Sequence, residues 1–407
     1  MGRPPAQALE RDPEIETVIG IDRRPPKVAL ERTEFVQVSD AHSLIRRIVD
    51  AAEIDTVVDT RLVVDSIVTT ARRAHENNVI GTMNVLAACA GEGSPVRKLV
   101  FKSSAHYYGC EQDDPAFFRE EMRRPHPART AIERDIVEAE KQVRDFGLKN
   151  DHVTVTVLRF ANALGPDLRT SFQEWLDLPL VPTILGFDPR CQFLHEDDMA
   201  AALEHAVRED LDGIFNVAAD GVLAMTEVIS LLGKAPVPVL PPWGTKAALP
   251  VLRALGASPC PELLNQLRFG RGLDNRRFKA TGFRFRYTTR EAVLKLREHQ
   301  RLAPILGRGG EGYRYESAVE EFLRFSPSVR APNARPQLAA PANRAPGGAG
   351  RPTDAYGDLT AREVIAMLPS LGEADLRALR DHEAAGARRQ SVLKAIDRLV
   401  AQEPAAR

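Results

Sequence analysis

Short apolar runs followed by polar or small residues recur along the first 220 residues, with amphipathic stretches between them. Runs of this length are typical of strands, and those without alternation are typical of strands buried on both faces. They predict strands at 16–22, 34–38, 55–58, 99–101, 153–160 and 213–218. Helical spacing in the intervening stretches predicts helices at 41–52, 70–89, 130–146 and 199–207.

Residues 98–109 (KLVFKSSAHYYG) join one of these strands to a group of side chains capable of chemistry. Two serines, a histidine and two tyrosines follow the apolar run at once, and Gly109 supplies a turn. In an open parallel sheet, ligands bind beyond the carboxyl ends of the strands, so hydroxyls at this point face the ligand crevice. The same pattern also fits a buried strand that ends in a polar turn.

The composition excludes several function classes. A chain of 407 residues with 43% apolar residues can form two or three globular domains. The formal net charge of −1 lacks the basic excess that a nucleic-acid surface needs. No apolar run approaches the roughly 20 residues of a membrane span, and the N-terminus lacks the apolar core of a signal peptide. The four cysteines are scattered, which predicts reduced thiols in a cytoplasmic protein and no structural metal.

The C-terminal quarter has a different composition. Residues 331–355 are rich in Pro, Ala, Gly and Arg and predict a flexible linker. Residues 356–407 predict a small helical module that opens with a capping box at Thr360 and Glu363. So small a module buries little area alone, so we expect it to dock on the main domain, on another copy or on a protein partner.

Several motifs in one order resemble the extended short-chain dehydrogenase/reductases, the family of NAD-dependent nucleotide-sugar epimerases and dehydratases. The motifs lie between about residues 2 and 290 and are SSAHYYG, ENNVIGTMNVL, RFANALGP and QFLHEDD. The resemblance implies an α/β fold, a Rossmann-like doubly wound parallel sheet with a small substrate lobe and a C-terminal helical appendage. It places one domain at 1–325, with its core at about 1–165 and 190–220 and its substrate lobe at about 166–189 and 221–325.

The resemblance also implies roles for single residues. Ser104 would hydrogen-bond the substrate hydroxyl, while His106 and Tyr108 are candidate proton donors. Asp22 ends the strand at 16–22, where an acid accepts hydrogen bonds from the adenosine ribose and favours NAD over NADP. Arg23 and Arg24 follow it and could instead receive a 2′-phosphate. The remaining candidates contact the cofactor (Asp40 and Asn78) or the sugar-nucleotide phosphates (Asn162 and Arg271).

The sequence departs from the family pattern in three places. It lacks the first strand and the glycine-rich turn, so we expect residues upstream of Met1 in the native protein, or else a chain without a cofactor. Arg61 stands where the family has small residues, and it either blocks the dinucleotide or adds a cation for its phosphates. No tyrosine in the chain has a lysine four residues later, so the acid–base pair Y-x-x-x-K is missing. Glu133, Arg134 and Asp135 occupy that neighbourhood, as a substitute acid or base or as an exposed helix face.

Two functions remain open. The first is an NAD-dependent epimerase, dehydratase or reductase that acts by hydride transfer on a nucleotide-sugar or similar hydroxylated substrate, with an atypical active site. The second is a non-catalytic relative that binds a nucleotide or a protein partner and uses its C-terminal helices as an interaction arm. The family habit of pairing through two helices also implies a homodimer.

Overall fold

The computed structural model describes three ranges of the chain. These are 5–240 apart from 11, 24, 27–29, 38–41, 68, 92 and 167, then 261–306, and 377–401 apart from 378, 382 and 385–388. The chain forms two compact units, 1–316 and 317–407.

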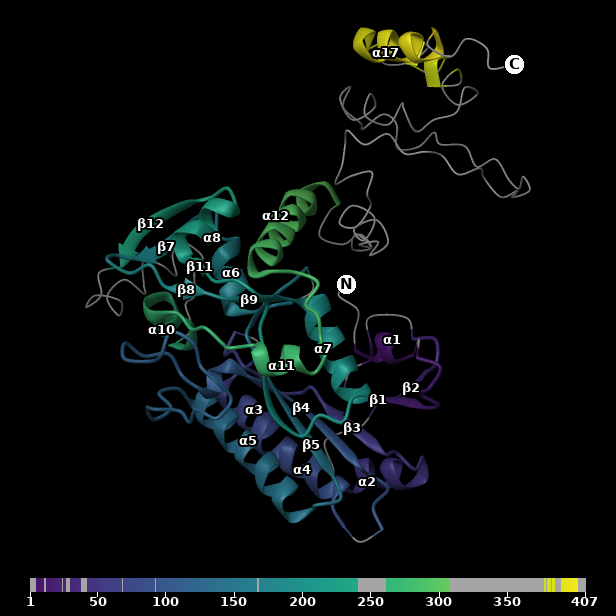
Figure 1. The fold of residues 1–407 in the computed structure, drawn as a ribbon, viewed down its shortest axis with the longest axis vertical. Helices are drawn as coiled ribbons and strands as arrows, with labels where there is room; N and C mark the ends of the chain where they lie inside the picture. Colours follow the sequence, from purple (N-terminus) through teal and green to yellow (C-terminus); the bar gives the residue numbers. More distant parts are fainter. Residues whose placement is uncertain are drawn as a thin grey trace. The chain divides into compact units, whose positions relative to one another are not determined.

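A parallel sheet forms the centre of the first unit (Figure 1). Its strand order is β10-β5-β4-β3, with bounds β3 (Thr56–Asp59), β4 (Lys98–Ser104), β5 (Thr154–Phe160) and β10 (Gly213–Val217). A separate parallel pair consists of β1 (Val18–Asp22) and β2 (Thr33–Gln37). Within the described ranges, β1 pairs only with β2, and β3 pairs only with β4. The predicted strands are therefore present, and they divide into two groups. The division falls where the family pattern has a first strand that this sequence lacks.

The residues of β4 alternate between two cores. Leu99 and Phe101 pack with the helices on one face, whereas Val100 belongs to a second core on the other face. Successive side chains of a strand point to opposite faces, so Lys102 and Ser104 share the face of Val100. In Figure 1, α4 and α5 lie on one side of the sheet and α7 on the other.

The helices connect the strands in the order that the sequence pattern predicts. Their bounds are α1 (Pro5–Leu9), α2 (His42–Ala51), α3 (Ala71–His75), α4 (Gly81–Cys89), α5 (Ala131–Lys149), α6 (Ser171–Asp177), α7 (Glu196–Arg208), α8 (Met225–Leu231), α10 (Pro261–Phe269), α11 (Arg276–Ala280) and α12 (Thr289–Leu306). The helix expected at 70–89 is interrupted by a π-helical turn, η1 (Glu76–Ile80). Such turns re-aim side chains and often occur at functional sites.

A smaller lobe has its own apolar core, built from α6, α8, α10 and α12 around short strands. The strand pairs are β6 (Asn162–Leu164) with β9 (Phe193–His195), β7 (Leu180–Ile184) with β12 (Ala235–Leu240), and β8 (Arg190–Cys191) with β11 (Leu223–Ala224). The lobe therefore contributes side chains beside the carboxyl end of the central sheet, where β6 follows β5.

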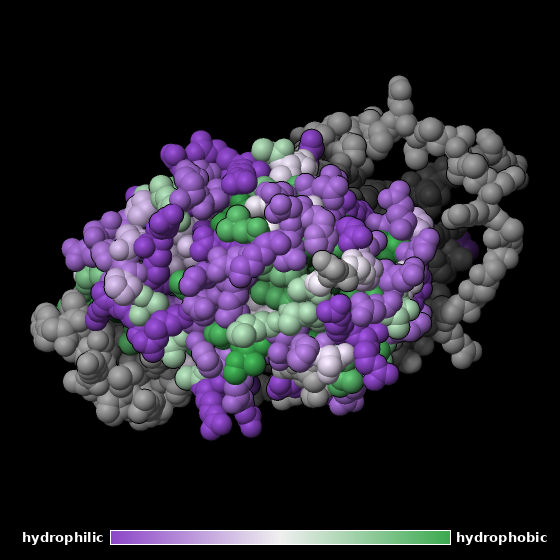
Figure 2. All heavy atoms as spheres, turned by 90° about the horizontal axis from the view of Figure 1, so that it is seen from below, coloured by the Kyte–Doolittle hydropathy of each residue, from purple (hydrophilic) through white to green (hydrophobic). Residues whose placement is uncertain are grey.

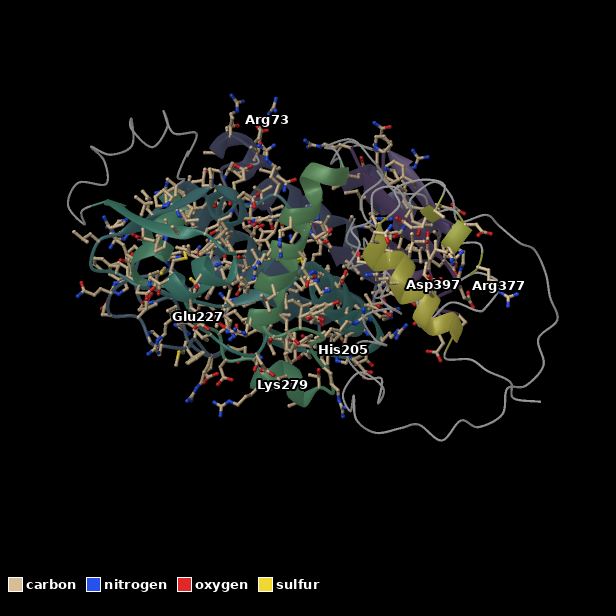
Figure 3. All side chains as sticks on the ribbon, turned by 90° about the horizontal axis from the view of Figure 1, so that it is seen from above. Arg73, His205, Glu227, Lys279, Arg377 and Asp397 are labelled. Carbon is tan, nitrogen blue, oxygen red and sulfur yellow. The ribbon has the colours of Figure 1, made fainter. Side chains whose placement is uncertain are left out.

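The face of the protein shown in Figure 2 is mostly polar. Figure 2 shows hydrophilic residues over most of one face, with apolar residues in separate patches. In Figure 3 the side chains of Arg73 on α3 and Lys279 on α11 point away from the body of the unit. None of the helices in the described ranges combines the length and apolar character needed to cross a membrane. Within the same ranges, no three His, Cys, Asp or Glu side chains meet in a way that could hold a metal ion.

In the second unit, α17 (Gln390–Ala401) follows the apolar spacing seen in the sequence and buries Val392 and Ile396. Arg389 pairs with the buried carboxylate of Glu383 at 2.9 Å. The predicted linker at 331–355 and the capping box at Thr360 lie outside the described residues.

Candidate functional site

A cavity of about 220 Å³ lies beyond the carboxyl end of β4. Its walls come from the loop at 62–65 after β3, the end of β4, the segment at 160–163, the segment at 168–172 and α10. Ligand pockets for whole drug-sized molecules occupy about 300–1,000 Å³. The cavity is smaller, so it can enclose one ring-sized part of a ligand.

Ser104 ends β4 and begins a short 3₁₀ turn, η2 (Ala105–Tyr107). Its backbone is extended, and its Oγ accepts a hydrogen bond from the backbone N–H of His106 at 3.3 Å. Gly109, with a φ of +85°, closes the turn, and a Cβ at this position would lie 3.0 Å from the guanidinium of Arg124. Arg124 donates to the carbonyl of His106 at 3.0 Å and pairs with Glu133, which fixes the turn against α5.

His106 links Ser104 to the smaller lobe. Its Nδ1 lies 2.8 Å from Ser104 Oγ, and its Nε2 lies 2.8 Å from Gln266 Nε2. Because Gln266 Oε1 accepts from Asn162 Nδ2 at 2.7 Å, the Gln266 amide nitrogen is the donor to His106. The ring proton of the neutral imidazole then resides on Nδ1 and is donated to Ser104 Oγ. Burial, with smaller effects from the charges of Arg271 and Arg124, holds the pKa of His106 well below its usual range, so the ring is neutral.

Ser104 is consequently a hydrogen-bond donor toward the cavity. Its Oγ already accepts from the ring and from the backbone N–H of His106. The hydroxyl proton has no acceptor among the described residues, and Ser104 lines the cavity. This arrangement suits an oxygen atom of a ligand, such as a hydroxyl or a carbonyl.

The residues of α5 that face the β4 serines contain no acid–base pair. Glu140 accepts a hydrogen bond from Ser103 Oγ at 2.9 Å and forms a buried ion pair with Arg159. Residues four and eight positions earlier lie on the same helix face, and these are Ile136 and Ile132, both in the apolar core. The charged residues considered from the sequence do not form this pair: Glu133 pairs with Arg124, Asp135 pairs with His75, and Arg134 is exposed.

The structure brings together part of the predicted site. Ser104, His106 and Asn162 form one hydrogen-bonded chain at the cavity, and Arg271 lies close enough to His106 to affect its pKa while donating to the carbonyl of Gly109 at 2.9 Å. Tyr108 is not at the cavity: its hydroxyl is buried and donates to Asn216 at 2.9 Å. Burial also raises the pKa of Tyr108 to about 12.

Two of the three predicted cofactor residues, Asp22 and Asn78, lie outside the hydrogen-bonded chain that runs from Ser104 to Asn162. Asp22 is exposed at the carboxyl end of β1. Asn78 is buried in η1, where its Oδ1 accepts from the backbone N–H of Val63 at 2.8 Å and its Nδ2 donates to the Val63 carbonyl at 2.7 Å. Asn78 therefore holds the loop that forms one wall of the cavity. Asp40 lies outside the described residues.

Two site residues were missed from the sequence. Gln266 comes from α10, 160 residues after His106, so no local motif indicates it. Lys102 lines the cavity on the face that it shares with Ser104. Lys102 directly follows the apolar run at 99–101, and the alternation of side chains along a strand could have placed it on the face of Ser104.

The family follows from comparison of the sequence with known proteins. Residues 1–218 match the NAD dependent epimerase/dehydratase family. The chain belongs to this family. An uncharacterized protein of Mycobacterium tuberculosis is 34% identical over 305 residues, which cover 73% of this chain and 81% of the relative. An uncharacterized protein of Sinorhizobium fredii is 24% identical over 263 residues, which cover 60% of this chain and 63% of the relative.

Solved structures of epimerases and dehydratases share the fold of this family member. A UDP-glucose 4-epimerase from Thermotoga maritima with UDP-glucose has a TM-score of 0.54 at 17% identity and covers 70% of this chain and 91% of that chain. A UDP-glucuronic acid 4-epimerase from Bacillus cereus with NAD has a TM-score of 0.54 at 14% identity, and the match covers 73% of this chain and 94% of that chain. A dTDP-glucose 4,6-dehydratase from Bacillus anthracis with NAD has a TM-score of 0.51 at 16% identity, and the match covers 69% of this chain and 87% of that chain.

The described residues of this family member fit only one end of a dinucleotide. The Asp22 carboxylate stands at a strand end, as recognition of the adenosine ribose requires. Both amide atoms of Asn78 are engaged by Val63, and Arg61 holds Asp59 through two nitrogens. The described residues include no glycine-rich turn at a helix N-terminus that could cradle a pyrophosphate.

Proposed function

We propose that this chain binds a nucleotide-sugar or similar hydroxylated ligand in the Ser104 cavity and acts on it by NAD-dependent hydride transfer from an atypical site. The observation that carries the proposal is the Ser104 hydroxyl, which is oriented by two donors from His106 and directs its own proton to the cavity. Membership of the epimerase/dehydratase family supports the reaction class. When bound, NAD would accept and return a hydride.

The chain's own residues bind and orient the ligand. Ser104 donates to an oxygen on the reacting ring, and the chain from His106 through Gln266 to Asn162 fixes the direction of that hydrogen bond. Apolar side chains at 62–64, 160–161 and 263 line much of the rest of the cavity and exclude water. His106 is neutral, so its ring adds no positive charge at the Ser104 hydroxyl.

The test is binding of UDP-glucose and dTDP-glucose to the full chain, measured by calorimetry, and their conversion in the presence of NAD, measured by separating the nucleotide sugars, because a returned hydride leaves no NADH to absorb. Ser104→Ala removes one hydrogen bond to the ligand, and we expect at least a roughly tenfold loss of affinity or of turnover. Ser94→Ala is the matched control, because Ser94 is buried before β4 and bonds Val96 outside the cavity. Equal affinities and rates in Ser104→Ala and the native chain would remove Ser104 from the site.

A second candidate function is ligand binding without turnover. The positions of α5 that face the β4 serines are Ile132 and Ile136, and no tyrosine lines the cavity among the described residues. Under this alternative, a nucleotide sugar binds with Ser104-dependent affinity while the sugar is recovered unchanged. Interconversion of the sugar by the purified chain would exclude it.

A further inference from the structure

Lys102 is a cationic residue at the cavity that makes no hydrogen bond or ion pair with another described residue. Its side chain lines the cavity. Lys98 on the same strand shows the contrast, since its Nζ donates to the carbonyl of Val207 at 2.9 Å and pairs with Asp210 at 2.8 Å. Lys102 is half-buried, and an ammonium that lacks a protein acceptor between largely apolar walls favours a ligand that supplies one.

The carboxylates near the cavity are already engaged. Asp59 accepts from Arg61 Nε at 3.0 Å and from Arg61 Nη2 at 2.9 Å. Asp65 accepts from the backbone N–H groups of Ile67 and Ser171. Burial lowers the pKa of Lys102, and the charge of Asp59 opposes that effect without contact. No described carboxylate therefore neutralises Lys102 by direct contact.

Ser104 supplies a second donor on the same face. Its hydroxyl proton is directed to the cavity, and alternate residues of a strand are about 6.6 Å apart along its axis. The β4 side of the cavity thus offers an ammonium and a hydroxyl donor, from Lys102 and Ser104, while most of the exposed lining is apolar. A planar group with two negatively charged oxygens satisfies both donors, since each oxygen accepts from one of them.

We propose that the cavity selects a ligand whose sugar carries a carboxylate, held between the Lys102 ammonium and the Ser104 hydroxyl. The inference rests on the proposed function and narrows its substrate class from nucleotide sugars in general to acidic ones. The size of the cavity suits one ring with its carboxylate, while the nucleotide extends outside it.

UDP-glucuronic acid and UDP-glucose form the discriminating pair, because they differ only in a carboxylate against a hydroxymethyl group. We expect the native full chain to bind the acid at least about tenfold more tightly at fixed ionic strength, since charged hydrogen bonds exceed neutral ones. Lys102→Met keeps the length of the side chain and removes its charge, and it should bring the ratio of the two affinities to about one. Lys141→Met on the exposed face of α5 is the control. An unchanged ratio in Lys102→Met overturns the inference.

A stability measurement tests the unpartnered charge without any ligand. Removing an uncompensated ammonium should raise the thermal midpoint of Lys102→Met above that of the native chain. A lower midpoint would mean that Lys102 has a structural partner, and it would overturn the inference.

A smaller probe distinguishes failure of the proposed function from failure of the carboxylate site. If neither nucleotide sugar binds the native chain, the proposed function fails, and sodium glucuronate is compared with sodium chloride in thermal unfolding. A midpoint raised by glucuronate in the native chain but not in Lys102→Met supports the carboxylate site. An equal rise in sodium phosphate, or no rise in glucuronate, overturns it.

Discussion

At the scale of the residue, the charged side chains next to the β4 serines fall into two kinds. Arg159 and Glu140 are 1% and 0% exposed and neutralise each other through two hydrogen bonds, while Ser103 adds a third to Glu140. Such a pair fixes the relation of α5 to the sheet more than it adds net stability. Lys102 has no such arrangement, although it lies one position before Ser103. Arg159 and Glu140 therefore maintain the fold, whereas Lys102 faces the ligand in our proposal.

Asp198 gives a residue-scale prediction about pH. The side chain is fully buried at the start of α7 and accepts from the backbone N–H groups of Arg286 and Tyr287 at 2.9 and 3.1 Å. Burial raises its pKa from 3.8 to about 6. The folded state therefore binds the proton more tightly than the unfolded state. The resulting stability is fully present below about pH 4 and is lost as pH rises through about pH 6.

We expect the free energy of unfolding of the native chain to fall, relative to Asp198→Asn, by on the order of 2–3 kcal/mol between about pH 4 and about pH 7. The amide cannot ionise, so its variant lacks this part of the pH dependence. Urea unfolding at several pH values measures the difference, with Asp212→Asn on the exposed segment after α7 as the control. A difference between native and Asp198→Asn that stays constant with pH would contradict the assignment.

The residue scale also shows what the sequence could and could not predict. Ser104 and Asn162 belong to local motifs beside strands, and the structure places both at the cavity. The partner that joins them, Gln266, comes from a helix 104 residues after Asn162, so its role depends on tertiary packing alone. Asn78 shows the opposite case. Its motif predicts a contact with the cofactor, whereas its side-chain amide hydrogen-bonds the backbone of Val63.

At the scale of the element, apolar periodicity predicted the strands of the central sheet and of the β1–β2 pair and the helices between them, but not the elements of the smaller lobe. Strand β1 was expected at 16–22 and is observed at Val18–Asp22, and the helix expected at 130–146 is α5 at Ala131–Lys149. The π-helical turn η1 was not predicted, because it depends on contacts between Asn78 and the loop after β3 rather than on spacing. Propensity sets where helices form, and tertiary hydrogen bonds set how their turns are wound.

The contact between η1 and the loop at 61–65 gives an element-scale prediction. Asn78→Ala leaves the backbone N–H and carbonyl of Val63 without partners, at a cost of about 1–3 kcal/mol. We expect faster amide exchange at Val63 and a several-fold loss of affinity for the ligand, because residues 62–65 form one wall of the cavity. Hydrogen exchange followed by mass spectrometry measures the first effect. Asn150→Ala at the end of α5 is the control, and exchange at Val63 that equals the native rate would refute the role of Asn78.

At the scale of the whole molecule, the two groups of strands are joined through helices and loops. Arg208 on α7 pairs with Asp12 at 2.6 Å, and Arg32 donates to the carbonyl of Glu10 at 2.9 Å. These contacts tie the β1–β2 pair to a helix that packs on the central sheet. The position of Asp22 relative to the cavity thus depends on α1 and α7 rather than on strand pairing between β1 and β3.

The assembly of the whole molecule gives the last prediction. Ile80 and Met83 lie three positions apart where η1 meets α4, and they are 46% and 52% exposed. Residues at this spacing share one helix face, and an exposed apolar face is a feature of association surfaces. We expect the native chain to be a homodimer that pairs through this face, and we expect Met83→Asp to convert it to a monomer, because a charge is costly at an apolar interface. Sedimentation velocity measures the change.

Leu185→Asp introduces the same charge at a residue that is 58% exposed in the turn after β7, and it should leave the dimer intact. A dimer that survives Met83→Asp, or a native chain that sediments as a monomer, would refute this mode of assembly.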